Sequence, residues 1–253
     1  MLNFFEYDGI DSRDFGILIR NKTSYNQFKY TNQYISIPGR DGDIIKSNNK
    51  AENIIVEYEL IMYANRISGN DRNLALRLAI QDVKEWLIPN SNYKKLTDSY
   101  IGADCYYQAN FNGDINFQSL DADTVTFTVT FNCKPYKYLF EGENALTYTY
   151  SGSPIYVHNN EIAKAYPYIK ITGSGDIKLI VANSNTGVFG VEISDVSGYV
   201  EVDSEMQNCY KGTSSMNNSF TGKFPILGAG NNAFSAGYGT ITQLEIIPRW
   251  RRL

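Results

Sequence analysis

The residues best suited to nucleophilic or metal chemistry are a single histidine, His158, and three cysteines, Cys105, Cys133 and Cys209. A Ser–His–Asp or Cys–His site would have to be built on that histidine, because a base must activate the nucleophile. His158 lies in the polar run 157–161, which favours a surface turn over a catalytic base. A zinc site needs about four nitrogen or sulfur ligands at close spacing, and these residues are scattered. The sequence therefore predicts no catalytic residue, no metal ligand and no cofactor.

Carboxylates are plentiful, with 27 Asp and Glu residues, and a glycosidase needs only a pair of them. No pair stands in a context that marks it for acid–base work. Gly173 and Gly175 lack the third glycine and the following helix of a dinucleotide-binding loop, so they predict a hairpin turn. Asp41 and Asp43 do not extend into a calcium-binding loop. We therefore expect that the protein is not an enzyme.

The charge balance gives no general attraction to nucleic acid, because the formal net charge is −4. A basic cluster does occur near the C-terminal end, where Arg249, Arg251 and Arg252 surround Trp250. We interpret it as an ion-paired anchor or a solvated tail rather than a phosphate site.

The cysteines are odd in number, far apart and outside any C-x-x-C pair, which is typical of reduced thiols. The first residues, 1–6, carry no basic segment of the kind that opens a signal peptide. No apolar run approaches the ~18 residues of a membrane span. We expect a soluble protein that is made in the cytoplasm of a cell.

Alternating patterns dominate the elements that would position any site. Apolar residues recur at every second position from 53 to 62 and again from 124 to 131, where threonines fill the other face. Both segments are predicted to be half-buried strands. Between Asn73 and Leu87 the apolar spacing changes to that of an amphipathic helix, which Asn70 or Asp71 caps and Pro89 ends. Trp86 is expected to be a core residue of this helix.

The pattern changes again near Phe140, where we place a domain boundary. Beyond it, short strands are predicted at 166–172, 177–182, 188–194 and 199–203, with turns between them. Strands at this spacing, with turn residues at each break, are typical of a β-sandwich. The predicted fold class is mainly β with one amphipathic helix. Whether the last strand, 240–247, completes the sandwich or returns to the first domain stays open.

The turn Pro38-Gly39-Arg40-Asp41-Gly42 is rigid, because proline fixes φ and the glycines allow positive φ. With its neighbours, this turn resembles the signature of the distal tail proteins of long-tailed, non-contractile phages that infect Gram-positive hosts. The other segments that carry the resemblance, in order along the chain, are 15–17, 166–171, 224–232 and the C-terminal Pro248-Arg249-Trp250-Arg251. Each motif is weak alone, and their order and spacing span nearly the whole chain.

The resemblance implies that residues 1–139 form a ring-forming, tail-tube-like β domain and residues 140–253 a galectin-like β-sandwich. It implies a homo-hexamer that continues the tail tube on one side and meets the tail-associated tip protein on the other. The second domain would hold upper baseplate or receptor-binding proteins. DNA would pass through the lumen without specific binding, and the protein would reside in the virion, at the distal tail.

The segment 90–120 is rich in aromatic residues but alternates poorly. We therefore predict that part of it is an arm that embraces the neighbouring subunit, with Tyr93, Tyr100, Tyr106 and Tyr107 as its candidate contacts. The alternative is an ordinary long surface loop.

Two other functions compete with ring assembly. A carbohydrate-binding module is the first, since His158-Asn159-Asn160 resembles the start of the galectin His-x-Asn motif. Glu161 and Ile162 stand where that motif continues with Pro-Arg, so we expect the sugar site to be lost. A wall-degrading hydrolase is the second, and no residue supports it. Because phosphate contacts accumulate with each arginine, we also expect Arg249, Arg251 and Arg252 to lie at domain or subunit contacts, away from a DNA channel.

Overall fold

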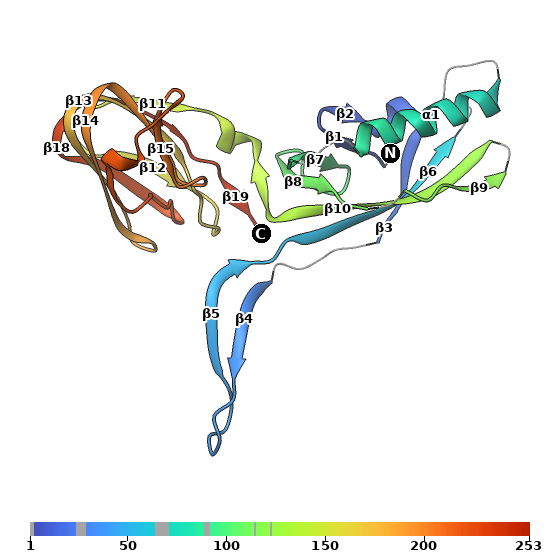
Figure 1. The fold of residues 1–253 in the computed structure, drawn as a ribbon, viewed down its shortest axis with the longest axis horizontal. Helices are drawn as coiled ribbons and strands as arrows, with labels where there is room; N and C mark the ends of the chain where they lie inside the picture. Colours follow the sequence, from blue (N-terminus) through green and yellow to red (C-terminus); the bar gives the residue numbers. More distant parts are fainter. Residues whose placement is uncertain (1–2, 24–28, 64–70, 89–91, 114, 122) are drawn as a thin grey trace. The chain divides into compact units, whose positions relative to one another are not determined.

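A computed structural model describes residues 3–23, 29–63, 71–88, 92–113, 115–121 and 123–253 (Figure 1). The chain divides into two compact units, one of residues 1–137 with Leu253 and one of residues 138–252. The predicted boundary at 139/140 lies two residues from this division. The prediction of a mainly β fold with one α-helix among the described residues is confirmed. No described helix has the length and apolar character needed to cross a membrane.

The first unit is built on a nine-stranded sheet with the central order β2-β1-β7-β8-β10-β6-β3. Its strands are β1 (Phe5–Tyr7), β2 (Ile10–Asp11), β3 (Ile17–Lys22), β6 (Ile54–Tyr63), β7 (Lys94–Asp98), β8 (Cys105–Phe111), β9 (Gln118–Asp121), β10 (Thr124–Leu139) and the short β19 (Arg251–Arg252), which pairs with β10. Two further strands, β4 (Tyr30–Ile35) and β5 (Ile44–Ala51), form a separate two-stranded sheet.

The two segments with alternating apolar residues form the centre of the sheet. They become β6 and β10, which pair antiparallel from Tyr63 opposite Thr124 to Ile54 opposite Cys133. This register places Leu60 opposite Phe127 on the buried face, while Glu59 lies opposite Thr128 on the other face. Because neighbouring side chains point to opposite faces, one register fixes the whole core surface of both strands.

The helix α1 (Arg72–Leu87) covers the buried face of this sheet, as its apolar stripe predicts. Asp71 caps its start by accepting a hydrogen bond from Leu74 N at 3.2 Å. The other predicted cap, Asn70, and the predicted stop, Pro89, lie outside the described residues. Trp86 stacks on Phe5 with ring centroids 5.4 Å apart and donates its indole N–H to a backbone carbonyl. It is therefore a core residue with its polar atom satisfied.

The second unit is one eight-stranded sheet folded over its own core. Its strands are β11 (Leu146–Thr149), β12 (Ile155–Asn159), β13 (Tyr168–Asn183), β14 (Gly187–Asp203), β15 (Asn208–Lys211), β16 (Ser214–Ser215), β17 (Phe220–Gly222) and β18 (Gly230–Ile247). The three long strands β13, β14 and β18 run through both layers of the resulting sandwich.

This continuity corrects the prediction of four short strands between 166 and 203. The segments predicted as turns at 173–176 and 195–198 are bends inside β13 and β14, which stay paired on both sides of them. Gly175 and Gly198 adopt positive φ angles of 77° and 85°, so the backbone can bend there without ending the strand. The turn predicted at 183–187 is a true connection. The last strand, 240–247, lies in β18 and completes the sandwich.

Gly239, near the bend of β18, is expected to tolerate no side chain. It has a φ of 82°, and a Cβ at this position would collide with the backbone carbonyl of Asp176 on β13. We expect Gly239→Ala to lower the free energy of unfolding by about 3 kcal/mol, the sum of a left-handed conformation and an overpacked contact.

Gly187→Ala is the matched control. Its φ is 87° and nothing lies within 4 Å of the added Cβ, so only the conformational cost of about 1 kcal/mol applies. Urea unfolding followed by circular dichroism measures both variants. Equal losses for the two would show that the contact with β13 contributes nothing.

Candidate assembly interface

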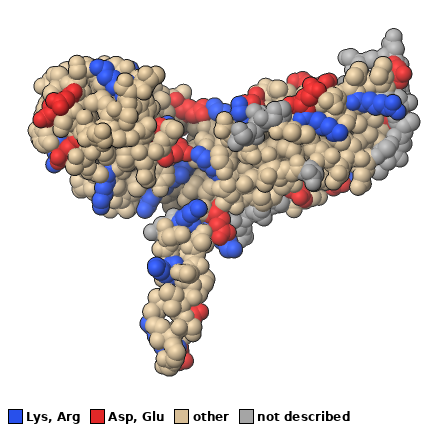
Figure 2. All heavy atoms as spheres, in the orientation of Figure 1, with Lys and Arg blue, Asp and Glu red and all other residues tan. Residues whose placement is uncertain are grey.

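The hairpin of β4 and β5 extends away from the nine-stranded sheet of the first unit (Figure 1). Every described residue of β4, and every residue from Ser36 to Asn48, is exposed. Among these are several large apolar side chains, including Tyr34 at 63% and Ile45 at 61% exposure. Figure 2 shows the hairpin as a mostly uncharged surface with isolated charges.

Apolar side chains occupy both faces of the hairpin. Tyr34 lies directly opposite Ile45, and the next pair, Ile35 opposite Ile44, points to the other face. A single partner surface would leave one of these pairs in water. The hairpin is therefore suited to lie between, or wrap around, elements of another molecule.

The turn Pro38–Gly42 forms the tip of this hairpin. Gly39 and Gly42 have φ angles of 80° and 79°, and Arg40 N donates to Ile37 O at 3.2 Å. Glycine is needed at both positions, because other residues adopt such positive φ angles only with strain. The structure thus places the signature turn at the end of the projecting element.

An isolated two-stranded hairpin is at best marginally stable in water, and an exposed apolar one favours aggregation. Contiguous apolar patches on soluble monomers usually mark interaction sites. The hairpin of this chain therefore needs a partner surface to bury its side chains.

The root of the hairpin is tied to the first unit by hydrogen bonds. Asn53, which follows β5, donates to the Tyr93 hydroxyl at 2.7 Å. Thr23, which follows β3, donates its hydroxyl to the Glu57 carboxylate at 2.6 Å and its backbone N–H to the Glu57 carbonyl at 3.1 Å. These contacts fix where the two strands leave the sheet.

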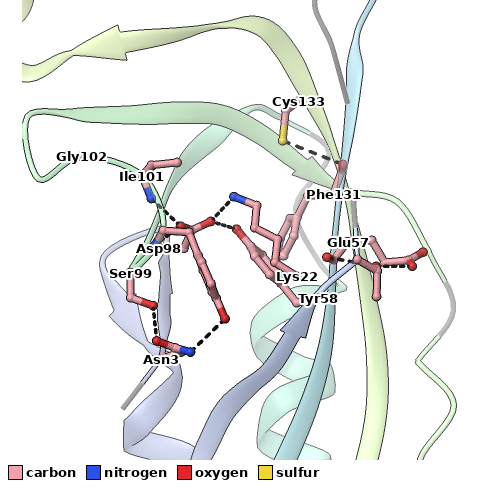
Figure 3. A network of polar contacts seen from close by, with 12 residues as sticks. Asn3, Lys22, Glu57, Tyr58, Asp98, Ser99, Ile101, Gly102, Phe131 and Cys133 are labelled. Atoms are coloured by element: carbon pink, nitrogen blue, oxygen red, sulfur yellow. Dashed lines mark hydrogen bonds and ion pairs between the residues drawn. The ribbon is translucent and has the colours of Figure 1, made fainter. Parts of the chain in front are cut away.

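A buried ion pair stands next to this root (Figure 3). The Nζ of Lys22, the last residue of β3, lies 2.8 Å from Oδ2 of Asp98, and their side chains are 4% and 0% exposed. The other carboxylate oxygen of Asp98 accepts backbone N–H groups from Tyr100 at 2.7 Å and Ile101 at 2.9 Å. The Tyr58 hydroxyl also donates to Asp98. The carboxylate is thus fully hydrogen-bonded, as a buried charge requires.

Aromatic rings complete the surroundings of Lys22. Its Nζ lies between 5.7 and 5.8 Å from the ring centres of Tyr58, Tyr100 and Tyr107. Burial, with Asp98 nearby, raises the pKa of Tyr58 well above its usual value. Burial also raises the pKa of the Cys133 thiol to about 12, which keeps it protonated and unreactive. This site joins β3, β6 and β7.

The structure places the arm candidates of segment 90–120 within the first unit, and their contact with a neighbouring subunit stays a prediction. Tyr106 and Tyr107 are 3% and 8% exposed within their own unit, on β8. Tyr93 and Tyr100 are partly exposed, but they bond Asn53 and Asn3 of the same chain. The aromatic residues of this segment serve the core and the hairpin root, and the element that projects is the hairpin of β4 and β5.

The C-terminal arginines act as an ion-paired anchor within the second unit. Arg249 binds Asp203 through two hydrogen bonds of 2.7 and 2.8 Å, and Arg252 binds Glu161 at 2.7 Å. Arg251 donates to the backbone carbonyl of Lys164 at 2.8 Å. Arg249 thus ties the end of β14 to the chain end, while Arg251 and Arg252 both bind the segment between β12 and β13. A further contact with another subunit stays a prediction.

The other signature residues at this end are structural as well. Trp250 is buried in the core of the second unit, and its carbonyl accepts the Leu139 N–H at 3.0 Å. Pro248 ends β18 immediately before the turn at Arg249, whose φ is 55°. The left-handed residue redirects the chain so that the arginines face their partners.

The Asp203–Arg249 pair predicts a dependence of stability on pH. Burial opposes ionisation of Asp203, but hydrogen bonds from Arg249 and from two backbone N–H groups outweigh it and hold its pKa below 3.8. A depressed pKa contributes stability that is present above about pH 4 and lost as the pH falls through the folded value. We expect Asp203→Asn to lower the melting temperature at pH 7, and the difference from the wild type to shrink between pH 4 and pH 2. A constant difference over this range, measured by calorimetry, would contradict this account.

The remaining candidate residues are not brought together. His158 lies on β12, not in the predicted loop, and its Nδ1 is 2.7 Å from the side-chain oxygen of Asn231. The three cysteines form no disulfide and are buried. In the described ranges no three His, Cys, Asp or Glu side chains gather as a metal site would require.

Two comparisons with known proteins found matches to this chain. Residues 11–133, which include the hairpin, match the family model of the phage tail protein RIFT-related domain. Among solved structures, the whole chain superposes on the crystal structure of the Dit protein of SPP1 with a TM-score of 0.73 and 17% identity, covering 100% of both chains. That protein is described as a hub of the adsorption apparatus in phages that infect Gram-positive hosts. No curated protein sequence matches the chain.

Proposed function

We propose, from the premise that this chain carries a phage tail protein domain and has the fold of a distal tail protein, that it is the structural hub of a siphophage tail. Six copies would close into a ring through the first unit. The ring would join the tail tube to the tail tip and leave a central channel for DNA. The protein would act by holding other proteins in place, without catalysis.

The hairpin of β4 and β5 is the observation that carries this proposal. It leaves Tyr34, Ile35, Ile44 and Ile45 in water in the single chain. A heterologous contact, in which the hairpin of each subunit embraces the next, closes a ring when it is repeated around an axis. Ring closure would bury every hairpin at once, which removes the exposed apolar strands.

The two units suggest different tasks. The first unit matches the phage tail family and carries the hairpin, so we assign the ring, the contact with the tube end and the contact with the tip protein to it. The second unit lies outside the matched residues and has its own core. We assign to it the docking of upper baseplate or receptor-binding proteins. DNA would pass the lumen without specific binding, and the assembled protein would belong to the distal end of the virion.

Electron microscopy of the purified full chain in negative stain tests the proposal directly. We expect six-fold rings, single or back to back, and native mass spectrometry should give the mass of six chains or twelve. A monomer at the micromolar concentrations of both measurements would overturn the ring. A closed ring of another number would retain the hub and correct its symmetry.

A further inference from the structure

The buried ion pair of Lys22 and Asp98 has the arrangement of a site for amide formation (Figure 3). Joining a lysine to an aspartate needs an amine beside the carboxyl carbon. It also needs donors for the charge that develops on one carboxyl oxygen, and a proton for the oxygen that leaves. The contacts of Asp98 meet each of these requirements.

The amine of this arrangement is Nζ of Lys22. It lies 2.8 Å from Oδ2 of Asp98, and the carboxyl carbon is one bond further, so amine and carbon are about 3.5 Å apart, close to a near-attack distance. The two side chains are 4% and 0% exposed, which keeps water away from both. They lie 76 positions apart in the chain, on β3 and β7. Only the folded chain therefore holds the two reacting groups in contact.

The second carboxylate oxygen, Oδ1 of Asp98, faces a pair of backbone donors. Tyr100 N and Ile101 N donate to it at 2.7 and 2.9 Å. When an amine adds to the carboxyl carbon, negative charge gathers on this oxygen, and two aligned N–H groups stabilise that charge. The turn after β7 thus supplies the donors that acyl-transfer sites use as an oxyanion hole.

The leaving oxygen, Oδ2 of Asp98, has a proton donor beside it. The Tyr58 hydroxyl donates a hydrogen bond to this atom. Burial, with Asp98 nearby, raises the pKa of Tyr58, so the hydroxyl keeps its proton at neutral pH. Tyr58 can therefore give a proton to Oδ2 and recover one from the attacking nitrogen.

We propose that the folded chain joins Lys22 to Asp98 by an amide bond between Nζ and Cγ. A proton first moves from the ammonium to Oδ2, which leaves a neutral amine and a neutral carboxyl group. Nζ then adds to Cγ, and the Cγ–Oδ2 bond breaks as Oδ2 leaves with two protons as water. One ammonium and one carboxylate thus give one amide and one water, without an oxidant, a reductant or another co-reactant.

Burial favours the amide over the ion pair. Two charges inside a protein carry a desolvation penalty that a neutral amide does not carry, and the released water joins the solvent. The reaction is slow, because the ionised pair must first become neutral and the reactive state is a minor one. Freshly folded chains therefore hold the ion pair, and joined chains accumulate with time.

The bond would stabilise the first unit beside the root of the hairpin. It closes a covalent loop from β3 to β7, which lowers the conformational entropy of the unfolded chain. The reaction occurs once in each chain and needs no neighbouring subunit. The inference is therefore independent of ring formation, and a monomer would carry the same bond.

Mass spectrometry of the full chain, held for two weeks at neutral pH, tests the inference. We expect the intact mass to fall by the mass of one water. Tryptic digestion should yield a branched peptide in which Lys22 is joined to Asp98, with no cleavage after Lys22. Joined chains should also melt at a higher temperature than fresh chains.

The branched peptide is the decisive observation, because an aspartate that cyclises to a succinimide also loses one water. Such cyclisation favours Asp-Gly sequences such as Asp8-Gly9 and Asp41-Gly42, and it joins no two peptides. A loss of water without the branch would overturn the inference. An unchanged wild-type chain after two weeks would overturn it as well.

Two matched variants assign the roles of the side chains. Tyr58→Phe retains the ring, the amine and the carboxyl group, and should slow the joining about 100-fold, because the general acid is lost. Joining at the wild-type rate would exclude Tyr58 from the reaction. Lys22→Arg retains the positive charge, but a guanidinium does not lose its proton to become a nucleophile, so no branch should form. A branch at Asp98 in this variant would show that another residue attacks and would overturn the inference. Circular dichroism should show both variants folded, and the measurement on the wild-type chain stands without them.

Discussion

We expect the double variant Tyr34→Lys/Ile45→Lys to be a monomer under conditions in which the wild type forms rings. The two residues face each other on one side of the hairpin, and both are more than half exposed in the single chain. Burying each such side chain contributes about 1.5–3 kcal/mol, and a buried lysine ammonium adds a desolvation cost. The loss of at least about 3 kcal/mol at every contact weakens each by a factor of more than 100.

Size-exclusion chromatography with light scattering measures this effect. Ile162→Lys/Met206→Lys is the matched control, because these residues are 86% and 72% exposed and lie on the second unit. It introduces the same charge and should leave the rings intact. Both double variants should remain folded by circular dichroism, since no core contact is removed. A hexamer formed by the hairpin variant would exclude this pair from the interface.

The largest effect on folding is expected from Asp98→Ala. This change leaves the Lys22 ammonium buried without its counter-charge and removes the acceptor of two backbone N–H groups. Breaking a buried pair by removing one partner costs about 3–5 kcal/mol. We expect a loss of this size in the free energy of unfolding, measured by urea titration.

Two further variants separate the charge from the packing. Lys22→Met/Asp98→Asn removes both charges while retaining most of the volume and an acceptor for the backbone, so it should recover a large part of the loss. Glu59→Ala removes a partner of Arg20 in an exposed pair and should cost less than about 1 kcal/mol. If Asp98→Ala costs no more than Glu59→Ala, the buried pair does not stabilise the fold.

The position of the Lys22–Asp98 pair suggests why two charged side chains are present in the core of the first unit. It lies at the end of β3, where the chain leaves the sheet toward the hairpin, and it holds β3 against the turn that follows β7. A hydrophobic contact tolerates small shifts, whereas a hydrogen-bonded ion pair accepts one geometry. The pair therefore fixes where β3 ends, next to the root of the hairpin.

Much of the first unit could be predicted from the sequence, because its periodicities reflect burial. The alternation at 53–62 and 124–131 and the helical spacing at 73–87 became β6, β10 and α1 with few changes. Trp86 could be placed in the core because it lies on the apolar stripe of the helix. In each case the physical rule acts between near neighbours in the chain.

Sequence patterns did not predict features that depend on residues far apart in the chain, such as burial on distant strands and continued strand pairing. Tyr106 and Tyr107 occur in a segment with poor alternation, and their burial depends on strands that are far away in sequence. The turn at Pro38 could be predicted. The composition of 30–51, however, does not show that large apolar side chains of the hairpin are exposed. The bends at Gly175 and Gly198 were taken for turns, since a glycine-rich stretch predicts a change of direction without saying whether pairing continues.

The candidate interface was reached by two routes. The order of motifs from Phe15 to Trp250 suggested the family, and the structure then showed which element projects. The buried pair of Lys22 and Asp98 was missed, because a lysine and an aspartate that lie far apart in the chain have no common pattern.

The hydrogen bond from Leu139 to Trp250 has a consequence for how such proteins diversify. It holds the two ends of the second unit side by side, at 3.0 Å between donor and acceptor. All residues between Leu139 and Trp250 belong to the second unit and form one continuous segment of the chain. Exchange of this segment would therefore replace the core of the second unit and leave the hairpin and the core of the first unit in place.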